Sequence, residues 1–202
     1  MSFSHPARLG ALAGSMSRSV RGAASTFTQI VSEQVGMSVS HVELADRAML
    51  DRCFADFSDC GDGCLCGVTL RLRTAEGASA QAMLVLPERG GLALVRRMLG
   101  LRGDAGALSE LEQDALAEIG SIVINACTGA LAGSFGWDVE ASVPNVTVSS
   151  RDRPFCDGES LSSALVTHLR MHLSGLRVEG LVLLELSGID GPTLPGQRRL
   201  HA

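Results

Sequence analysis

The spacing of apolar residues along the chain predicts two long helices, each followed by strands. Apolar side chains recur at helical spacing from residue 9 to about 32 and again from 109 to 134. A short amphipathic helix is expected at 91–99 and a polar connection at 47–66. Alternation of apolar and polar residues predicts the strands, which are 35–44 with a shift near Ser40, 67–74, 81–87, 137–149, 165–173 and 178–186.

The order helix, strand, loop and hairpin occurs twice along the chain. Residues 12–45 overlay 116–149 without a gap at an offset of 104 residues, with seven identities in 34 positions. We therefore predict an internally duplicated, pseudo-twofold α+β fold of two layers, with two long helices packed on one continuous antiparallel sheet. A single domain covers residues 1–202, with half-repeats at 9–100 and 108–187 and a mobile tail at 188–202.

Composition narrows the class of protein. Apolar residues make up 46% of the chain, which is enough for a core, and the net charge of −5 without a basic block argues against nucleic-acid binding. The N-terminal residues lack the apolar segment of a signal peptide, and we expect no membrane span. These features predict a cytoplasmic protein whose cysteines are reduced thiols.

The helix predicted at 109–134 carries the most unusual pattern in the chain. Ser109 and Glu112 form a capping box, in which each side chain bonds the backbone amide of the other residue. An apolar face begins at Leu111 and continues through Ala126. Four polar residues recur at helical spacing and share another face, which we call the polar stripe: Asp114, Glu118, Ser121 and Asn125.

This helix, together with Val-Pro-Asn-Val at 143–146, resembles the CheC/CheX/FliY family of chemotaxis proteins. The family pattern is Asp or Ser, three residues, Glu, two residues, Asn, twenty-two residues and Pro. Asp114, Glu118 and Pro144 match this pattern in type and spacing, and Ser121 stands at the asparagine position. The resemblance covers most of the chain, because the duplicated helix–strand plan is also that of the family.

The resemblance implies a phosphatase that dephosphorylates the aspartyl phosphate of a CheY-type response regulator in bacterial chemotaxis. It implies that Glu118 pairs with a lysine of the regulator and that the asparagine position orients the attacking water. Ser121 is shorter than asparagine, so weak activity is expected. Asn125, one turn further along, is an auxiliary candidate together with Asp114 and Pro144. No cofactor of its own is expected, because the regulator carries the Mg²⁺.

The first half-repeat carries no equivalent of the full pattern. At the positions that correspond to the glutamate, the asparagine and the proline it has Gly14, Ser17 and Ser40. We therefore expect a single site in this chain.

Two other readings of the function remain open at this point. The loss of the asparagine favours a non-catalytic adaptor that binds a receiver domain or a CheD-type deamidase, and the family also contains flagellar switch components. Asp114 and Glu118 are also explained as solvated carboxylates near a helix N-terminus. Ser121, with Gly120, Ala126 and Gly129, is also explained as a contact between helices.

The cysteines and histidines give no strong metal motif. Cys53, Cys60, Cys64 and Cys66 lack the paired C-x2-C spacing of structural zinc sites. Only His168 and His172 stand at ligand spacing, and their alternation with Arg170 predicts that they face solvent. We therefore predict no metal site, and the role of the Cys-rich segment stays open.

Overall fold

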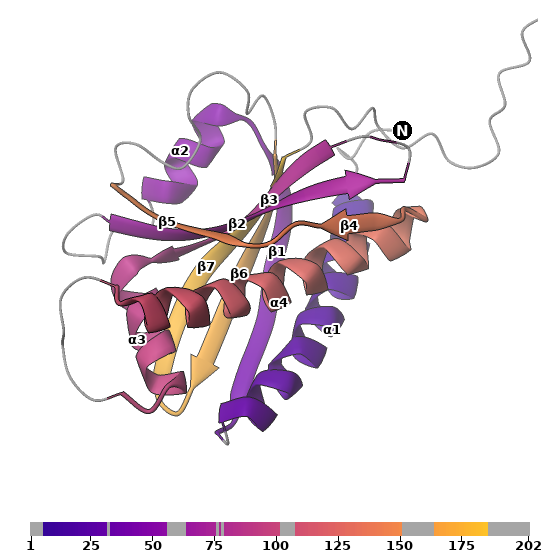
Figure 1. Cartoon of the computed structure of the whole chain (residues 1–202). Helices are drawn as coiled ribbons and strands as arrows, with labels where there is room; N and C mark the ends of the chain where they lie inside the picture. Colours follow the sequence, from indigo (N-terminus) through magenta and orange to yellow (C-terminus); the bar gives the residue numbers. More distant parts are fainter. Residues whose placement is uncertain are drawn as a thin grey trace, which may run out of the picture.

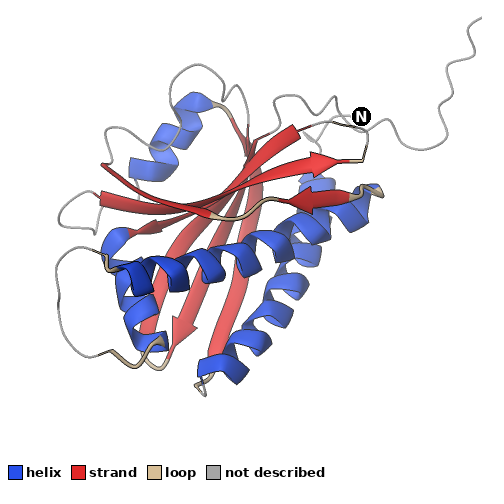
Figure 2. Cartoon of the chain, in the orientation of Figure 1, coloured by secondary structure: helices blue, strands red, loops and turns tan. Residues whose placement is uncertain are grey.

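The computed structural model describes residues 6–31, 33–55, 64–75, 77, 79–101, 108–150 and 164–185. These residues form one antiparallel sheet of seven strands with four helices around it (Figures 1 and 2). The strand order is β1-β6-β7-β3-β2-β4, and β5 also pairs with β2. The predicted α+β class with a continuous antiparallel sheet is confirmed.

The bounds of the helices and strands are α1 Pro6–Val31, β1 Val35–Ala45, α2 Arg47–Ala55, β2 Cys64–Thr74, β3 Ser79–Pro87, α3 Glu88–Met98, α4 Glu110–Phe135, β4 Val139–Ala141, β5 Asn145–Ser150, β6 Ala164–Leu173 and β7 Leu176–Glu185.

Three helices cover one face of the sheet, which we call the front face. Figure 1 shows α1, α3 and α4 on this side, and α1 and α4 contact each other. The main core lies between these helices and the alternate residues of the strands that face them. Its fully buried side chains include Phe27 of α1, Leu84 of β3 and Leu169 of β6. The two long predicted helices therefore pack on the sheet as expected.

The opposite, back face is covered in part by α2, where the sequence analysis predicted only a polar connection. That prediction was wrong for residues 47–55. Asp46 begins the helix by accepting a hydrogen bond from the Met49 amide at 2.8 Å. Leu50 and Phe54, one turn apart, then pack into a second, smaller core on the back face. Met49 and Cys53 pack against the same core, but the helix has only nine residues and precedes an Asp/Gly/Cys-rich segment, so its apolar pattern was too short to predict it.

The two halves of the chain agree closely with the offset of 104 residues. Both ends of α1 and α4 differ by that number, as do the first residues of β1 and β4. In each half, the edge strand contains one residue more than the strand it pairs with, and the two extra residues lie at equivalent positions of the repeat. This β-bulge lies at Ser40 between β1 and β6, and at residues 142–144 between β4–β5 and β2. The predicted shift near Ser40 is confirmed, and the strand predicted at 137–149 is divided in two around Pro144.

Helix α4 runs across the front face of the sheet and is the element that carries the polar stripe. Among the described residues it alone is long and apolar enough to cross a membrane by length and composition. Nine of its residues are buried in this fold, and most of them belong to the main core. Its apolar composition is therefore accounted for by packing within the protein.

Candidate functional site

The N-terminus of α4 is fixed by the capping box that the sequence predicts. Ser109 is the N-cap, its Oγ accepts a hydrogen bond from the Glu112 amide at 3.3 Å, and its own amide donates to Glu112 Oε2 at 2.8 Å. Arg96 of α3 donates to Glu112 Oε1 at 2.6 Å. The hydrogen bonds from Ser109 and then from Arg96 lower the pKa of Glu112 to about 2. This buried ion pair joins α3 to the start of α4.

The polar stripe lies on the side of α4 that faces away from the core. Asp114, Glu118 and Asn125 are exposed, and Ser121 is half-buried at the edge of the stripe. The buried positions, such as Leu116 and Val123, fall on the opposite side of the helix. The four stripe side chains make no hydrogen bond or ion pair to another described residue. Their polar atoms are therefore available to a partner, in contrast to those of Glu112.

Ser121 lies on the side of α4 that faces the β4–β5 segment. Thr128, seven residues further and thus on the same side of the helix, lines a small cavity together with Val139 of β4. Both β4 and β5 contact α4, and they run along it in Figure 1. Pro144 is half-buried between these two strands. The fold therefore brings the segment of Pro144 alongside the helix of the polar stripe.

The bulge that carries Pro144 is held against β2. The Ser142 amide donates to the Arg71 carbonyl at 2.8 Å, and Ser142 Oγ accepts from the Arg71 amide at 3.0 Å. Proline has no amide hydrogen to give to the ladder, which suits the bulge. The preceding Val143 projects outward with 85% of its surface exposed.

Leu111 was predicted on the apolar face of the helix, and this was wrong. It is 57% exposed, while the neighbouring Glu112 is buried. Arg96 and Ser109 satisfy the Glu112 carboxylate, which removes most of the cost of burying it. Leu111 therefore turns outward near the polar stripe and gives that surface an apolar margin.

The two glycines Gly120 and Gly129 of α4 do not act as a contact between helices. A Cβ at Gly120 would lie 2.4 Å from the Val68 Cβ, so this glycine allows α4 to approach β2. Gly129 is exposed and has no neighbour within 4 Å of such a Cβ. Gly120 thus serves packing on the sheet, not on another helix. Ala126 is half-buried against the main core.

In the first half-repeat, Gly14 and Ser17 are half-buried on α1 and Ser40 is exposed in the β1 bulge. The exposed side chain one turn beyond Ser17 is Arg21, whose Nε donates to the Ser17 carbonyl at 3.1 Å. This helix presents no acidic side chain among its described residues. The expectation of one site stays a prediction.

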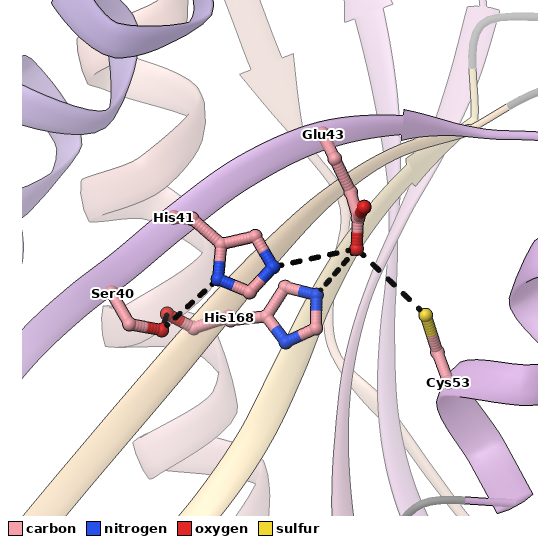
Figure 3. A network of polar contacts seen from close by, with 5 residues as sticks. All are labelled: Ser40, His41, Glu43, Cys53 and His168. Carbon is pink, nitrogen blue, oxygen red and sulfur yellow. Dashed lines mark hydrogen bonds and ion pairs between the residues drawn. The ribbon is translucent and has the colours of Figure 1, made fainter.

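Sequence analysis missed a cluster on the back face, formed by His41, Glu43, His168 and Cys53 (Figure 3). His168 was expected to face solvent, but it is half-buried and bonded to Glu43 at 2.7 Å. The bonded pair comes from β1 and β6, which are far apart in the sequence, so no local spacing could reveal it.

The Cys-rich segment is divided by the sheet. Cys53 lies on the back face beside Glu43, while Cys66 is buried in the front core, where its Sγ lies 3.6 Å from the Leu86 carbonyl. These two thiols therefore cannot hold the same ion. Cys60 lies outside the described residues, as does the tail at 188–202.

Comparison with known proteins gives the fold a context. No protein-family model matches the sequence, and the search of curated proteins found no match. Among solved structures, FliY from Thermotoga maritima has a TM-score of 0.66 at 18% identity over 91% of each chain. The FliM middle domain from H. pylori has a TM-score of 0.63 at 11% identity, over 92% of this chain and 95% of its own. CheX from Vibrio vulnificus has a TM-score of 0.51 at 16% identity, over 87% and 99%. A further similar chain is that of a FliG–FliM complex from H. pylori, at 11% identity and a TM-score of 0.62.

Proposed function

Since the chain has the fold of the CheC/CheX/FliY proteins, we propose that it binds a phosphorylated CheY-type receiver and dephosphorylates it weakly. The observation that carries this proposal is the family pattern at Asp114, Glu118 and Pro144. Asp114 and Glu118 lie on an exposed face of α4 and their side chains have no partner among the described residues, and Pro144 lies in the neighbouring β4–β5 bulge. Chemotaxis and a cytoplasmic location follow from the same proposal.

The reaction asks little of such a protein. An aspartyl phosphate is a reactive mixed anhydride, and the receiver itself supplies Mg²⁺ and the groups that bind the phosphoryl oxygens. Water attacks phosphorus in line, and the aspartate carboxylate leaves. The phosphatase has only to hold the receiver and place one water, which is mainly a matter of positioning.

Glu118 is suited to hold the receiver. Its carboxylate is exposed and opposite the core, where a lysine of the partner would meet it without disturbing the fold. Leu111 adds exposed apolar surface on the same side of α4, and Val143 adds it on the neighbouring β4–β5 bulge. Non-obligate interfaces combine apolar contacts with polar and charged groups, and this surface offers both.

Ser121 limits the chemistry. A serine hydroxyl reaches less far than an asparagine amide and rotates freely, whereas the amide has a donor and an acceptor at fixed positions. Misplacing the water by about 1 Å costs roughly a hundredfold in rate. Asn125 lies one turn further on the same exposed stripe and would place a water only if the receiver docked shifted along α4.

The test is the decay of a phosphorylated CheY-type receiver from the same organism, prepared with acetyl phosphate and freed of it, with and without this protein. We expect the wild-type protein to accelerate phosphate decay weakly. Ser121→Asn should raise this decay rate about tenfold or more, because the amide restores the position of the attacking water. Glu118→Gln should lose the acceleration. Asp51→Asn removes an exposed carboxylate from α2 on the other side of the sheet and serves as the matched control. Absence of any gain in Ser121→Asn would show that this helix is not a phosphatase site.

A non-catalytic adaptor is the second candidate, and the serine at position 121 favours it. One similar structure is a FliM chain solved in complex with FliG, so this fold is found in at least one protein assembly. The partner here would be a receiver or a CheD-type deamidase. Binding of the receiver, measured by calorimetry, without any change in phosphate decay would support the adaptor and exclude the enzyme. If no receiver binds, the polar stripe is not a receiver-docking surface.

A further inference from the structure

The back face of the sheet carries a second group of chemically active side chains, away from the polar stripe. Figure 3 shows His41 and Glu43 of β1, His168 of β6 and Cys53 of α2 turned toward one point. His41 and His168 are direct partners in the β1–β6 register, and their rings stack with centroids 3.7 Å apart. This group, which we call the back-face cluster, plays no part in the proposed function.

The β1 bulge creates the cluster. Met37 and Val42 both face the front core, although they stand five positions apart, because the strand contains an extra residue at Ser40. In a regular strand His41 would share the front face with Met37. With the bulge it lies on the back face with Glu43, directly opposite His168. The bulge thus places three donor groups on two adjacent strands.

The donor atoms are close enough to share one ion. His168 Nε2 lies 2.7 Å and His41 Nε2 3.5 Å from Glu43 Oε1, and Cys53 Sγ lies 3.9 Å from the same oxygen. The two histidines and the glutamate offer one donor atom each, all within 4.8 Å of one another. Tetrahedral Zn²⁺ with bonds of about 2.0–2.3 Å needs donors separated by roughly 3.3–3.7 Å. To bind one ion, the two stacked imidazole rings would have to turn so that both Nε2 lone pairs point at it. Cys53 Sγ, 3.9 Å from Glu43 Oε1, would have to move closer to the two histidines.

We propose that the back-face cluster binds one divalent transition-metal ion of the Zn²⁺ class, with His41, Glu43 and His168 as ligands and Cys53 as the fourth. Two imidazoles, a carboxylate and a thiolate form a ligand set that suits Zn²⁺ and Co²⁺ and not Mg²⁺ or Ca²⁺. Binding displaces the thiol proton and leaves each Nε2 lone pair on the metal. This inference departs from the sequence-based prediction of no metal site.

Neighbouring groups favour the required tautomer of His41. Ser40 Oγ lies 3.4 Å from His41 Nδ1, so it can accept that N–H and leave Nε2 free for the ion. Ser40 Oγ in turn donates to the His168 carbonyl at 3.4 Å. The site is partly shielded, since the side chains of His168 and Glu43 are 26% and 23% exposed.

An ion at this point would connect α2 to the sheet. Cys53 is the ligand from α2, whereas the other three come from β1 and β6. Helix α2 has nine residues and ends beside a segment outside the described structure. A bond from its last turn to two strands would slow the opening of this helix.

The test uses the full chain, freed of metal with a chelator and titrated with Zn²⁺ by calorimetry and with Co²⁺ by absorption. We expect one ion per chain, tetrahedral Co²⁺ bands in the visible range and a thiolate-to-cobalt band in the near ultraviolet. His41→Gln and His168→Gln should each weaken Zn²⁺ binding by about tenfold or more. His172→Gln changes an exposed histidine four residues further along the same strand; it is the matched control and should bind as the wild type does.

The fourth ligand has its own readout. Cys53→Ser should abolish the thiolate band, and Zn²⁺ should slow amide exchange in 47–55 only when Cys53 is present. Failure to bind Zn²⁺, or binding that survives both histidine variants, would overturn the site. Binding that needs both histidines but gives no thiolate band would overturn the assignment of Cys53. Circular dichroism of each variant shows that it folds, and none of these outcomes depends on the receiver.

Discussion

The ion pair at the start of α4 makes a quantitative prediction about stability. Glu112 is buried, and its carboxylate accepts three hydrogen bonds, from the Ser109 amide, the Ser109 hydroxyl and Arg96. Its pKa is lowered from 4.5 to about 2. At about 1.4 kcal/mol per pH unit, this difference corresponds to about 3 kcal/mol of unfolding free energy.

The direction of the pH dependence follows from the lowered pKa. The unfolded chain takes up the proton near pH 4.5 and the folded protein only near pH 2, so the contribution of Glu112 is complete above pH 4.5. It is lost as the pH falls toward 2, and about half of it remains near pH 3. Other carboxylates titrate in the same range, so the comparison must be made against a variant.

Glu112→Gln keeps the shape of the side chain and removes its charge. Urea unfolding at pH 7 should show a loss of about 2–3 kcal/mol, because Arg96 then lacks its carboxylate. The difference in unfolding free energy between the variant and the wild type should fall to about half of this value at pH 3. Glu110→Gln, an exposed carboxylate in the same helical turn, is the control and should change stability by less than about 1 kcal/mol. If the two proteins do not differ in unfolding free energy, or differ equally at pH 7 and pH 3, this account of the buried pair is refuted.

Two further predictions concern packing around α4. Gly120→Ala should destabilise the protein by about 1–2 kcal/mol, because its Cβ would lie 2.4 Å from that of Val68. Gly133→Ala, at an exposed position with open space, should be neutral or stabilising in the same urea titration; equal effects of the two would contradict the close approach. Burial raises the pKa of the Cys127 thiol to about 12. A variant that keeps only this cysteine should therefore react with a thiol reagent no faster than the protein unfolds, and fast labelling of the native state would argue against the burial.

Much of the fold follows from local patterns. The periodicity of apolar residues located α1, α4 and both hairpins, and the Ser109–Glu112 pair marked the start of α4. The prediction missed α2 because the local pattern there is weak. A nine-residue helix with four core-facing apolar positions and an N-cap aspartate gives a weak signal, and it gains its stability from strands that sequence spacing does not locate.

The candidate site was predicted in part. The spacing of Asp114, Glu118 and Asn125 required a common face, and the structure exposes that face. Whether it performs chemistry is a question for the receiver assay. The exposure of Leu111 could not be predicted, because periodicity assigns apolar residues to the core. It takes no account of Arg96 on another helix, whose ion pair allows Glu112 to be buried next to Leu111.

The sequence by itself determined α1, α3 and α4, the strands, the capping box and the bulge at Ser40, since each depends on residues within a few positions of one another. Only the tertiary structure decided which strands pair, because β1 and β6 meet across more than a hundred residues of chain. That pairing brings His41 and Glu43 to His168, and α2 then adds Cys53. Such contacts depend on the register of distant strands, which no local period encodes.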